Sequence, residues 1–361
     1  MVRSSARGTR IVLTGGGTAG HVMPHLALLP KLREAGWDVH YVGSSGIERD
    51  LIHPTGIPFH SILVGKLRRY LSVQNLFDVL KVFLGTLQAF LLLLRLRPDV
   101  VFSKGGFVSV PVAVGARLLG IPVVTHESDV TPGLANRVIE KFATRILYSF
   151  PETSRYVPAT ISRLVGSPVR QELLEGNRDK GLSFCGFSGE VRPVLLVMGG
   201  SQGAQRINEA LLADLPALLH HWRVVHLAGK GKLLDFTHPN YRAFEFLKHE
   251  LPDILAAADV VVSRAGANSI FELLALRKPM LLIPLKSGSR GDQLDNAQSF
   301  ARNGWARILD EASLAPGVLE REVEHLFREG SRLIEAQSSF SGGRDSQAVF
   351  HELEAVVKAR N

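Results

Sequence analysis

The sequence predicts an α/β protein built from two Rossmann-like, doubly wound domains that face a cleft. Short β-branched runs alternate with helical stretches, and this alternation is typical of parallel sheets covered by helices. The alternation restarts halfway along the chain, and each half opens with a strand followed by a glycine-rich turn. The 361 residues, 45% of them hydrophobic, suit two globular domains at about 150 residues per domain.

The β-branched runs are interpreted as buried parallel strands. In the first half they lie at 11–14, 38–42, 99–102 and 121–125. Helical patterns separate them around 24–35, 73–96 and 108–119. In the second half the strands are expected at 193–198, 222–228, 259–263 and 280–284.

The polar, glycine-rich segment 171–191 is the expected hinge between the halves. We therefore expect an N-terminal domain of residues 1–170 and a C-terminal domain of residues 171–344. A glycine pair followed by Asp-Ser predicts a helix start, so residues 345–361 form a last helix. That helix could stay with the second domain, and we expect it to cross back to the first.

The charge balance narrows the class of partner. The chain has 42 Lys and Arg against 34 Asp and Glu, a net charge of +8, which suits nucleic acid, an anionic membrane or a phosphate-bearing ligand. No basic recognition helix or zinc-finger spacing is present, so no nucleic-acid partner is expected. The single cysteine, Cys185, excludes an intramolecular disulfide or a cysteine-built zinc site. No apolar signal core precedes the first strand, which indicates a cytosolic protein.

The first glycine-rich loop, Gly15 to Gly20, has the pattern G-x-G-x-x-G between a strand and a helix. This pattern lets backbone N–H groups approach a pyrophosphate, although a tight turn without a ligand is the alternative. The second strand ends at Gly43 and Ser44, where a dinucleotide-binding protein would have an acidic residue, so NAD is disfavoured. His21 follows at the helix N-terminus, where a neutral imidazole suits a general base; packing under the loop is the alternative.

Two carboxylates, Glu127 and Asp129, follow the strand that ends at Thr125. The carboxyl edge of an open sheet faces the ligand crevice, so they could position a sugar hydroxyl or assist proton transfer. The alternative for Asp129 is that it, or Thr131, caps the following helix, because Pro132 stands near the helix start.

The second half offers two further sites for phosphate. Ser201, Gln202 and Gly203 begin a helix after a glycine pair, which forms a phosphate-sized nest. The segment 264–269 leads into another helix whose N-terminal N–H groups suit a diphosphate. Glu272, about one and a half turns into that helix, could accept hydrogen bonds from both hydroxyls of a ribose.

Six linked motifs resemble one enzyme family over nearly the whole chain. They are Gly15–His21, His126–Asn136, Gly166–Arg170, Gly199–Ala204, Ser263–Glu272 and Asp292–Ala297. The chain resembles the bacterial lipid II-forming N-acetylglucosaminyltransferases of glycosyltransferase family 28. The resemblance implies a GT-B fold and inverting transfer from UDP-N-acetylglucosamine to the muramyl 4-hydroxyl of a polyprenyl-pyrophosphate-linked acceptor. Another membrane-associated UDP-sugar glycolipid transferase, a Rossmann oxidoreductase and a silent nucleotide-sugar sensor are the alternatives.

The resemblance also implies roles for individual residues. Glu272 matches the ribose ligand, Leu247 borders the uracil and Gln293 contacts the sugar. His21 matches the proposed base, with Glu127 and Asp129 as further catalytic candidates. The donor-binding set also contains Thr18, Ala19 and Gly20 of the acceptor-side loop, together with Arg170, Ser201, Gln202, Gly203, Ala265, Gly266, Ala267 and Asn268. Gly105, Gly106 and Asn136 match the acceptor side.

The sequence departs from the family pattern at Ser128 and Asp129, where many relatives have Gln and Asn. Because an ionised Asp cannot donate a hydrogen bond to a sugar carbonyl, this change bears on the acceptor and on the base. No acidic metal motif is present, so no essential metal or other cofactor is expected. Helix N-termini and Arg170 would carry the charge of the leaving group.

The segment 76–96 predicts a helix whose apolar arc is wider than packing on a sheet requires. Asp78, Lys81 and Gln88 interrupt it, so it does not predict a membrane-spanning helix. One interpretation is a helix buried on both sides. The other is peripheral binding to an anionic membrane at its cytoplasmic face, with Lys66, Arg68 and Arg69 meeting the headgroups.

Overall fold

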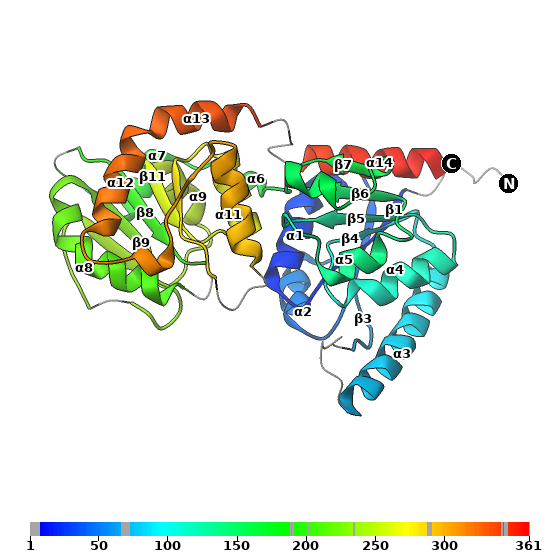
Figure 1. Ribbon diagram of the computed structural model, residues 1–361. Coiled ribbons are helices and arrows are strands. Elements are labelled where there is room, and N and C mark those ends of the chain that lie inside the picture. The colour runs from blue at the N-terminus through cyan, green and yellow to red at the C-terminus, as the bar shows by residue number, and fades with distance from the viewer. Residues whose placement is uncertain are drawn as a thin grey trace. The chain divides into compact units, whose positions relative to one another are not determined.

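The chain folds into two compact units, each an α/β sandwich of helices on a parallel sheet (Figure 1). The structure is a computed structural model that describes residues 8–65, 73–187, 189, 191–200, 203–233, 235–286, 291–340, 342 and 346–360. Unit 1 contains Met1–Pro168 and Gly342–Asn361, and unit 2 contains Val169–Ser341. The predicted fold class of two parallel α/β units is confirmed.

Unit 1 contains a seven-stranded parallel sheet with the order β3-β2-β1-β4-β5-β6-β7. The strands are β1 (Arg10–Thr14), β2 (Asp38–Gly43), β3 (Phe59–Ser61), β4 (Val100–Ser103), β5 (Val123–Glu127), β6 (Arg145–Tyr148) and β7 (Ser162–Leu164). Ile11 pairs with Val39 on one side and with Val100 on the other, so the strand order reverses at β1. Such a switch point opens a crevice at the carboxyl ends of the strands, where ligands bind in doubly wound sheets.

The two faces of this sheet are covered by different helices, since successive strand residues point to opposite faces. Ile11 and Leu13 belong to one buried cluster, which includes residues of α1 (Ala19–Glu34) and α14 (Gln347–Arg360). Val12 belongs to the other cluster, with residues of α3 (Val73–Leu96) and α4 (Ser109–Leu118). The shorter helices α2 (Ile47–Ile52) and α5 (Leu134–Ile139) follow β2 and β5.

Helix α14 completes the core of unit 1. Its buried residues Val349, Phe350 and Leu353 lie in the same cluster as Ile11 of β1. The Ser346 hydroxyl just before the helix donates a hydrogen bond to the carbonyl oxygen of Ala27 on α1, at 2.8 Å. The last helix of the chain is therefore an integral part of the first unit.

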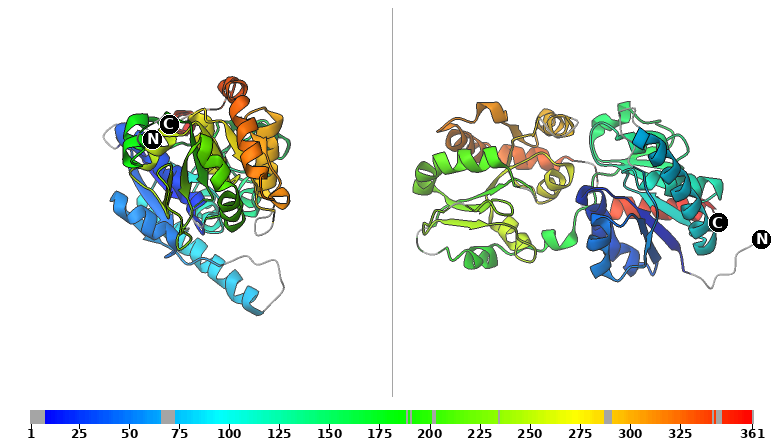
Figure 2. Two further views of the ribbon diagram at one scale, coloured as in Figure 1. Left: turned by 90° about the vertical axis from the view of Figure 1, so that its left-hand side faces the viewer. Right: turned by 90° about the horizontal axis from the view of Figure 1, so that it is seen from below.

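Helix α3 packs against the rest of unit 1 through its buried face, and its N-terminal part extends beyond the rest of the unit (Figure 2). A Cβ atom at Gly85 would lie 2.0 Å from the carbonyl oxygen of Leu63, so glycine is required where the chain crosses the helix. One turn later Gln88 accepts a hydrogen bond from the Leu63 N–H at 2.8 Å. Ala89 and Leu93 are fully buried on the same face.

Unit 2 contains a six-stranded parallel sheet with the order β10-β9-β8-β11-β12-β13. The strands are β8 (Val194–Met198), β9 (Arg223–Leu227), β10 (Tyr241–Phe244), β11 (Val260–Ser263), β12 (Met280–Leu282) and β13 (Arg307–Ile308). The helices are α6 (Gln171–Leu174), α7 (Arg178–Phe184), α8 (Gln205–His221), α9 (Leu251–Ala257), α10 (Ala267–Ala275), α11 (Asp292–Arg302), α12 (Val318–Arg328) and α13 (Gly330–Ser338).

The segment expected to be a hinge starts with two helices, α6 and α7, that pack on α9 within unit 2. A Cβ atom at Gly181 would lie 2.3 Å from the carbonyl oxygen of Asp253, so α7 approaches the α9 backbone directly. Gly176 and Gly181 of this segment therefore serve close packing against α9. The described connections between the units fall instead at Pro168 to Val169 and near Gly342.

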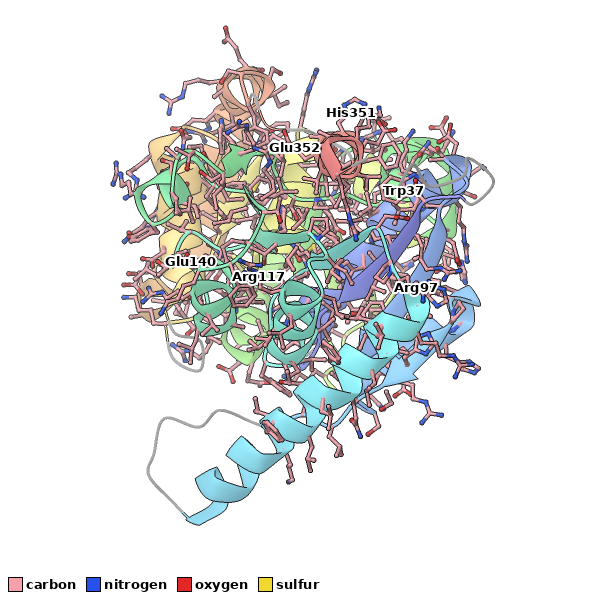
Figure 3. All side chains as sticks on the ribbon, turned by 90° about the vertical axis from the view of Figure 1, so that its right-hand side faces the viewer. Trp37, Arg97, Arg117, Glu140, His351 and Glu352 are labelled. Carbon is pink, nitrogen blue, oxygen red and sulfur yellow. The ribbon has the colours of Figure 1, made fainter. Side chains whose placement is uncertain are left out.

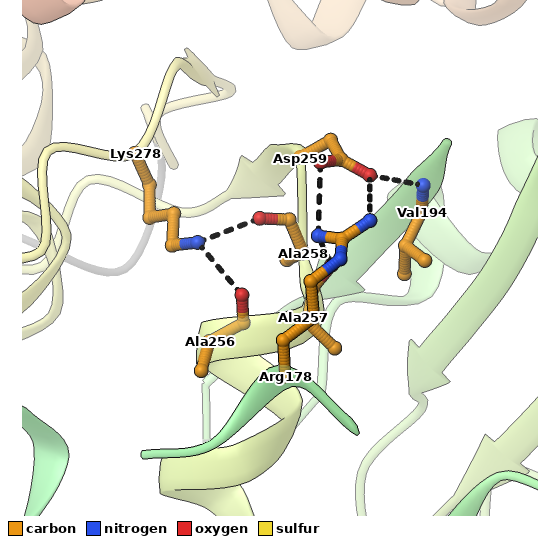
Figure 4. Close-up of polar contacts among 7 residues, drawn as sticks. All are labelled: Arg178, Val194, Ala256, Ala257, Ala258, Asp259 and Lys278. Atoms are coloured by element: carbon orange, nitrogen blue, oxygen red, sulfur yellow. Dashed lines mark hydrogen bonds and ion pairs between the residues drawn. The ribbon is translucent and has the colours of Figure 1, made fainter. Parts of the chain in front are cut away.

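Two cations lie at the carboxyl end of α9 (Figure 4). Arg178 donates two hydrogen bonds of 3.0 Å to Asp259 and one of 2.6 Å to the carbonyl of Ala257. Lys278 donates to the carbonyls of Ala256 and Ala258, at 3.2 and 2.7 Å. Positive side chains stabilise the negative end of the helix dipole and satisfy carbonyls that have no helical partner. This network fixes α7 and α9 to the sheet.

Candidate functional site

Two loops meet at the carboxyl edge of the unit 1 sheet, one after β1 and one after β4, and glycines allow their close approach. A Cβ atom at Gly106, after β4, would lie 2.4 Å from the carbonyl oxygen of Gly16, after β1. A Cβ atom at Gly17 would lie 2.7 Å from the ring of Phe107. Gly105 and Gly106 both have φ of +79°, which side chains disfavour. Gly106 thus lies against the first glycine-rich loop, whereas a Cβ atom at Gly105 would lie 3.0 Å from Asn136 Oδ1.

His21 lies in the first turn of α1, beside these loops. Its ring is half-buried, and its Nδ1 atom lies 3.0 Å from the hydroxyl of Thr18. Thr18 is the N-cap residue of α1, but its hydroxyl makes no capping hydrogen bond to the helix backbone. The hydroxyl is hydrogen-bonded to the His21 imidazole instead. A Cβ atom at Gly106 would approach the same Nδ1 to 3.3 Å. The imidazole is thus held in place next to exposed Gly17, Thr18 and Gly20.

Glu127 organises the loop after β5. Its Oε1 accepts hydrogen bonds from the N–H groups of Ser128 and Asp129, at 2.9 and 3.0 Å. Its Oε2 accepts from the Gly133 N–H at 2.9 Å and from the Asn136 side chain at 2.8 Å. The carboxylate is buried, and four donors within its own loop use both oxygens. This geometry favours a positioning role for Glu127 over proton transfer.

Asn136 and Asp129 differ in their burial and in their hydrogen bonds. Asn136 is buried and also accepts a hydrogen bond from Thr125 at 2.9 Å, so it joins β5 to α5. Asp129 is half-buried, and its N–H is held by Glu127. The alternative in which Asp129 or Thr131 caps α5 is wrong: the N-cap is Gly133, and the carboxylate bonded there belongs to Glu127.

Three buried polar residues at this edge were missed by the sequence reasoning. Tyr41 donates to the Gly15 carbonyl at 2.7 Å, and burial raises the pKa of its phenol. Glu48 of α2 accepts from the Ser44 N–H at 2.9 Å. Lys104 lies between β4 and the glycine pair. A lysine directly after a buried strand and before two glycines is a signal that could have identified it.

The glycine-rich turn of unit 2 joins β8 to α8. Gly203 has φ of +67°, and a Cβ atom there would lie 2.1 Å from the Ala228 carbonyl oxygen. A Cβ atom at Gly199 would lie 2.3 Å from the Ala204 nitrogen. Only glycine fits both positions, so the backbone closes tightly around the helix start. Ser201 and Gln202, predicted to contact the donor, lie outside the described residues.

A buried hydrogen-bond network supports this turn. Asn208 of α8 donates to the Ala228 carbonyl at 3.0 Å, and its Oδ1 lies 3.0 Å from His226 Nε2. The other ring nitrogen of His226 lies 3.0 Å from the Tyr241 hydroxyl. Burial lowers the pKa of His226 to about 4, so its ring is neutral at physiological pH. The network joins β9, β10 and α8 beneath Gly203.

Two predicted donor-binding residues of unit 2 pair with each other. Arg170 Nε lies 3.1 Å from Glu272 Oε1, and the two side chains are 19% and 18% exposed. Burial raises the pKa of Glu272, and the Arg170 charge opposes that shift. A partly buried ion pair of this kind holds both side chains in defined positions while each keeps some access to solvent.

Four of the other predicted donor-binding residues, Ala265 to Asn268, lie at the start of α10. Gly266 is the N-cap, Ala265 and Ala267 are buried, and Asn268 lies in the first turn. Asn296 of α11 donates to the Ala265 carbonyl at 3.3 Å. On the same helix Gln293 accepts from the Leu285 N–H at 3.0 Å. Leu247, after β10, is buried.

The described part of the chain contains no group of three or more His, Cys, Asp or Glu residues that could hold a metal ion. Within the same residues, no helix has the length and apolar character to cross a membrane.

Comparison with known proteins covers both units. The glycosyltransferase family 28 N-terminal domain matches residues 11–148, and the family 28 C-terminal domain matches residues 194–350. A Geobacillus kaustophilus protein is 52% identical over 328 residues, covering 90% of this chain and 92% of that protein. An Oceanobacillus iheyensis protein is 48% identical, covering 97% and 99%. Both are named UDP-N-acetylglucosamine--N-acetylmuramyl-(pentapeptide) pyrophosphoryl-undecaprenol N-acetylglucosamine transferase.

Solved structures show the same fold. Acinetobacter baumannii MurG matches with a TM-score of 0.74 and 24% identity, covering 97% of this chain and 99% of that chain. A calicheamicin glycosyltransferase matches with a TM-score of 0.70 and 18% identity, covering 98% and 99%. The predicted GT-B fold is confirmed. Because both family models match and together span most of the sequence, the chain belongs to glycosyltransferase family 28.

Proposed function

We propose that the chain transfers N-acetylglucosamine from UDP-N-acetylglucosamine to the muramyl 4-hydroxyl of undecaprenyl-pyrophosphoryl-muramyl-pentapeptide, inverting the anomeric centre. The product is the lipid-linked disaccharide used in peptidoglycan synthesis. The observation that carries this proposal is the identity of 48% and 52% to relatives whose names state this donor and acceptor. That identity spans at least 90% of the chain, so it includes both units.

Unit 2 is proposed to bind the donor. Glu272 would accept hydrogen bonds from the ribose hydroxyls, and the N–H groups at the start of α10 would meet the diphosphate. Arg170, at 3.1 Å from Glu272, would neutralise charge on the leaving diphosphate once the donor is present. Leu247 would border the uracil, and Gln293 would contact the sugar. Ser201, Gln202 and Gly203 complete the proposed nest for the diphosphate.

Unit 1 is proposed to bind the acceptor and to supply the base. In the transfer step the acceptor 4-hydroxyl oxygen attacks the anomeric carbon, and its proton passes to His21. The bond from that carbon to the diphosphate oxygen breaks, and UDP leaves with the electron pair. Asp129 is the next candidate for the base, because its neighbour Glu127 is engaged by four donors. The leaving group is proposed to be stabilised by Arg170 and α10 without an essential metal.

Helix α3 is proposed to dock on the membrane that holds the acceptor (Figure 3). Phe83, Leu87, Leu91 and Leu94 recur every three or four residues and are 66%, 48%, 55% and 49% exposed. The opposite face, with Ala89 and Leu93, is fully buried. Exposed side chains in one such stripe are typical of helices that lie in a membrane interface. We propose peripheral attachment at the cytoplasmic face.

The predicted basic partners of this surface, Lys66, Arg68 and Arg69, lie outside the described residues. Their proposed contact with anionic headgroups therefore rests on the sequence. Arg95, near the C-terminal end of α3, is exposed. A cation at that end would add to the attraction of the helix for an anionic surface.

One assay tests the activity. Labelled UDP-N-acetylglucosamine is incubated with a short-chain lipid I analogue, and the product is identified by mass. We expect the acceptor mass to increase by one N-acetylhexosamine residue. If the chain transfers the sugar only to a different glycolipid acceptor, that result would support the alternative glycolipid transferase. If it binds the donor but forms no product, that result would support a nucleotide-sugar sensor.

A further inference from the structure

Lys104 is a buried cation at the carboxyl edge of the unit 1 sheet. It is 2% exposed and directly follows β4, and its backbone N–H donates to the Thr14 carbonyl of β1 at 2.9 Å. A lysine is almost never buried to this extent unless it is paired. Because the Lys104 side chain is buried, a ligand does not reach its amine directly. Any effect of Lys104 on substrate must therefore act through the groups around it.

Two side chains receive its hydrogen bonds, one at the end of β5 and one in the loop after it. The Nζ atom contacts His126 Nδ1 and donates to the Ser128 hydroxyl at 2.6 Å. The other nitrogen of His126, Nε2, lies 2.8 Å from the Gly166 carbonyl oxygen. Because a carbonyl only accepts, Nε2 carries the ring proton, and the Nδ1 lone pair faces Lys104. The Gly166 carbonyl and the Lys104 amine therefore favour the same tautomer of a fully buried imidazole.

The charged and titratable groups around Lys104 come from three elements. Burial lowers the pKa of Lys104 to about 7, while Glu127 and Asp129 of the loop after β5 oppose this shift. His25 of α1 and His126 of β5 also face it, and burial together with the Lys104 charge lowers the pKa of both rings. Lys104 is thus the cation that balances the two carboxylates at this edge.

We propose that Lys104 is a positioning residue for the acceptor. It helps to hold His126 in one tautomer and fixes the path of residues 126–129. This inference rests on the proposed function, because it takes the acceptor to bind at this edge of unit 1. The departure from the family pattern at Ser128 and Asp129 fits this role. Ser128 supplies the hydroxyl that Lys104 binds, and Asp129 supplies one of the two negative charges that Lys104 balances.

Four variants test the inference. Lys104→Met keeps the chain length but removes the charge and the donors, and Lys104→Arg keeps the charge. Ser128→Ala removes only an acceptor of the Lys104 bond and should not affect folding. The matched control is Lys278→Met in unit 2, because Lys278 is also partly buried and donates to two backbone carbonyls. Each variant is measured for UDP affinity and for kcat/KM with a short-chain lipid I analogue.

We expect Lys104→Met to lower kcat/KM for the acceptor by about 10- to 100-fold, the usual effect of losing a group that orients a functional side chain. UDP affinity should remain within about twofold, since the donor-binding residues of unit 2 are untouched. Lys104→Arg should recover part of the loss. Ser128→Ala should cause a smaller loss that is not additive with Lys104→Met. Lys278→Met should lower the melting temperature without a selective loss on the acceptor.

The pH profile provides a readout that a purely structural role would not change. As pH rises through the pKa of about 7, Lys104 loses its charge opposite Glu127 and Asp129. The acceptor kcat/KM of the wild type should therefore contain a decline above this pH that Lys104→Arg lacks.

NMR of histidine labelled with 15N tests the positioning without any substrate, with His126→Gln used to assign the signal. In the wild type the His126 ring should stay neutral with the proton on Nε2. In Lys104→Met the Nδ1 resonance should shift because that lone pair loses its hydrogen-bond donor, while burial continues to hold the pKa of the ring low. An unchanged Nδ1 resonance in Lys104→Met, or an equal loss of UDP and acceptor binding, would overturn the inference. If the wild type rejects the lipid analogue while the NMR result holds, the proposed acceptor is wrong and the positioning role stands.

Discussion

Removing the exposed apolar side chains of α3 should release the protein from membranes. The variant replaces Phe83, Leu87, Leu91 and Leu94 with glutamine. Glutamine is a good helix former, so the helix and its buried face at Ala89 should persist. Any loss of vesicle binding then reports on the exposed stripe and not on the fold.

The expected magnitude follows from the exposed fractions. Full burial of such a side chain is worth about 1.5–3 kcal/mol, and each of these four is roughly half to two-thirds exposed. Complete immersion of the exposed parts would thus give about 4 kcal/mol for the four. Immersion at an interface is partial, so about 2–4 kcal/mol is expected. This corresponds to a loss of roughly 30- to 1000-fold in the partition coefficient.

Co-sedimentation with phosphatidylglycerol vesicles measures this loss directly, at several lipid concentrations and at low salt. Activity on a soluble short-chain acceptor should stay at the wild-type level, because α3 is remote in sequence from the donor-binding residues. Activity on a vesicle-embedded acceptor should fall with the partition coefficient. The matched control replaces four exposed apolar residues of unit 2 with glutamine: Leu174, Leu212, Leu233 and Ile334.

The control should pellet with vesicles as the wild type does. If both quadruple variants lose binding equally, general surface hydrophobicity explains the attachment. If neither loses binding, the stripe on α3 has another partner, and our reasoning about the membrane is wrong.

Three further changes address the other proposed surfaces. Glu272→Ala should cost about 2–4 kcal/mol in kcat/KM for the donor, because it leaves the ribose hydroxyls unpaired and removes one carboxylate partner of Arg170; Glu272→Gln should cost less. His21→Ala should lower kcat by about 10²–10⁴-fold in single-turnover assays, with UDP affinity nearly unchanged. Changing Lys66, Arg68 and Arg69 together to serine should weaken vesicle binding by about 3 kcal/mol at low salt, and added salt should shrink the difference.

Each of these has a result that contradicts it. Unchanged donor kinetics in folded Glu272→Ala would remove the ribose assignment. A fully active His21→Ala would place the base elsewhere, with Asp129 next to be tested. Equal sedimentation of the wild type and the triple serine variant at low salt would leave the apolar stripe as the sole proposed membrane contact.

The central strands of both sheets could be predicted because burial on both faces makes them continuous β-branched runs. Val100–Ser103 and Val260–Ser263 are examples, and both are buried throughout. The strands at or near the sheet edges lack this signal. Tyr241–Phe244 contains an arginine and an alanine, and Arg307–Ile308 has only two residues. Neighbouring strands, and not local propensity, define such short elements.

The candidate site residues could likewise be predicted only in part. Glu272 and His21 could be located because each follows a strand and a glycine-rich turn, where a doubly wound sheet must open. The partners of these residues could not be predicted from the sequence, because partners such as Arg170 and Glu272 are 102 residues apart. Lys104 had a local signal in its place between a buried strand and a glycine pair, but only the folded chain shows that Ser128 and His126 receive its hydrogen bonds.

The position of α14 affects the order in which the units can be completed. During synthesis the whole of unit 2 leaves the ribosome between the two segments of unit 1. Unit 2 is continuous and can reach its final packing while unit 1 still lacks Val349, Phe350 and Leu353. Domains usually finish in the order in which they are made. Here the unit that starts first is finished last, so a premature stop codon near the end of the gene would damage the half of the protein that was translated earliest.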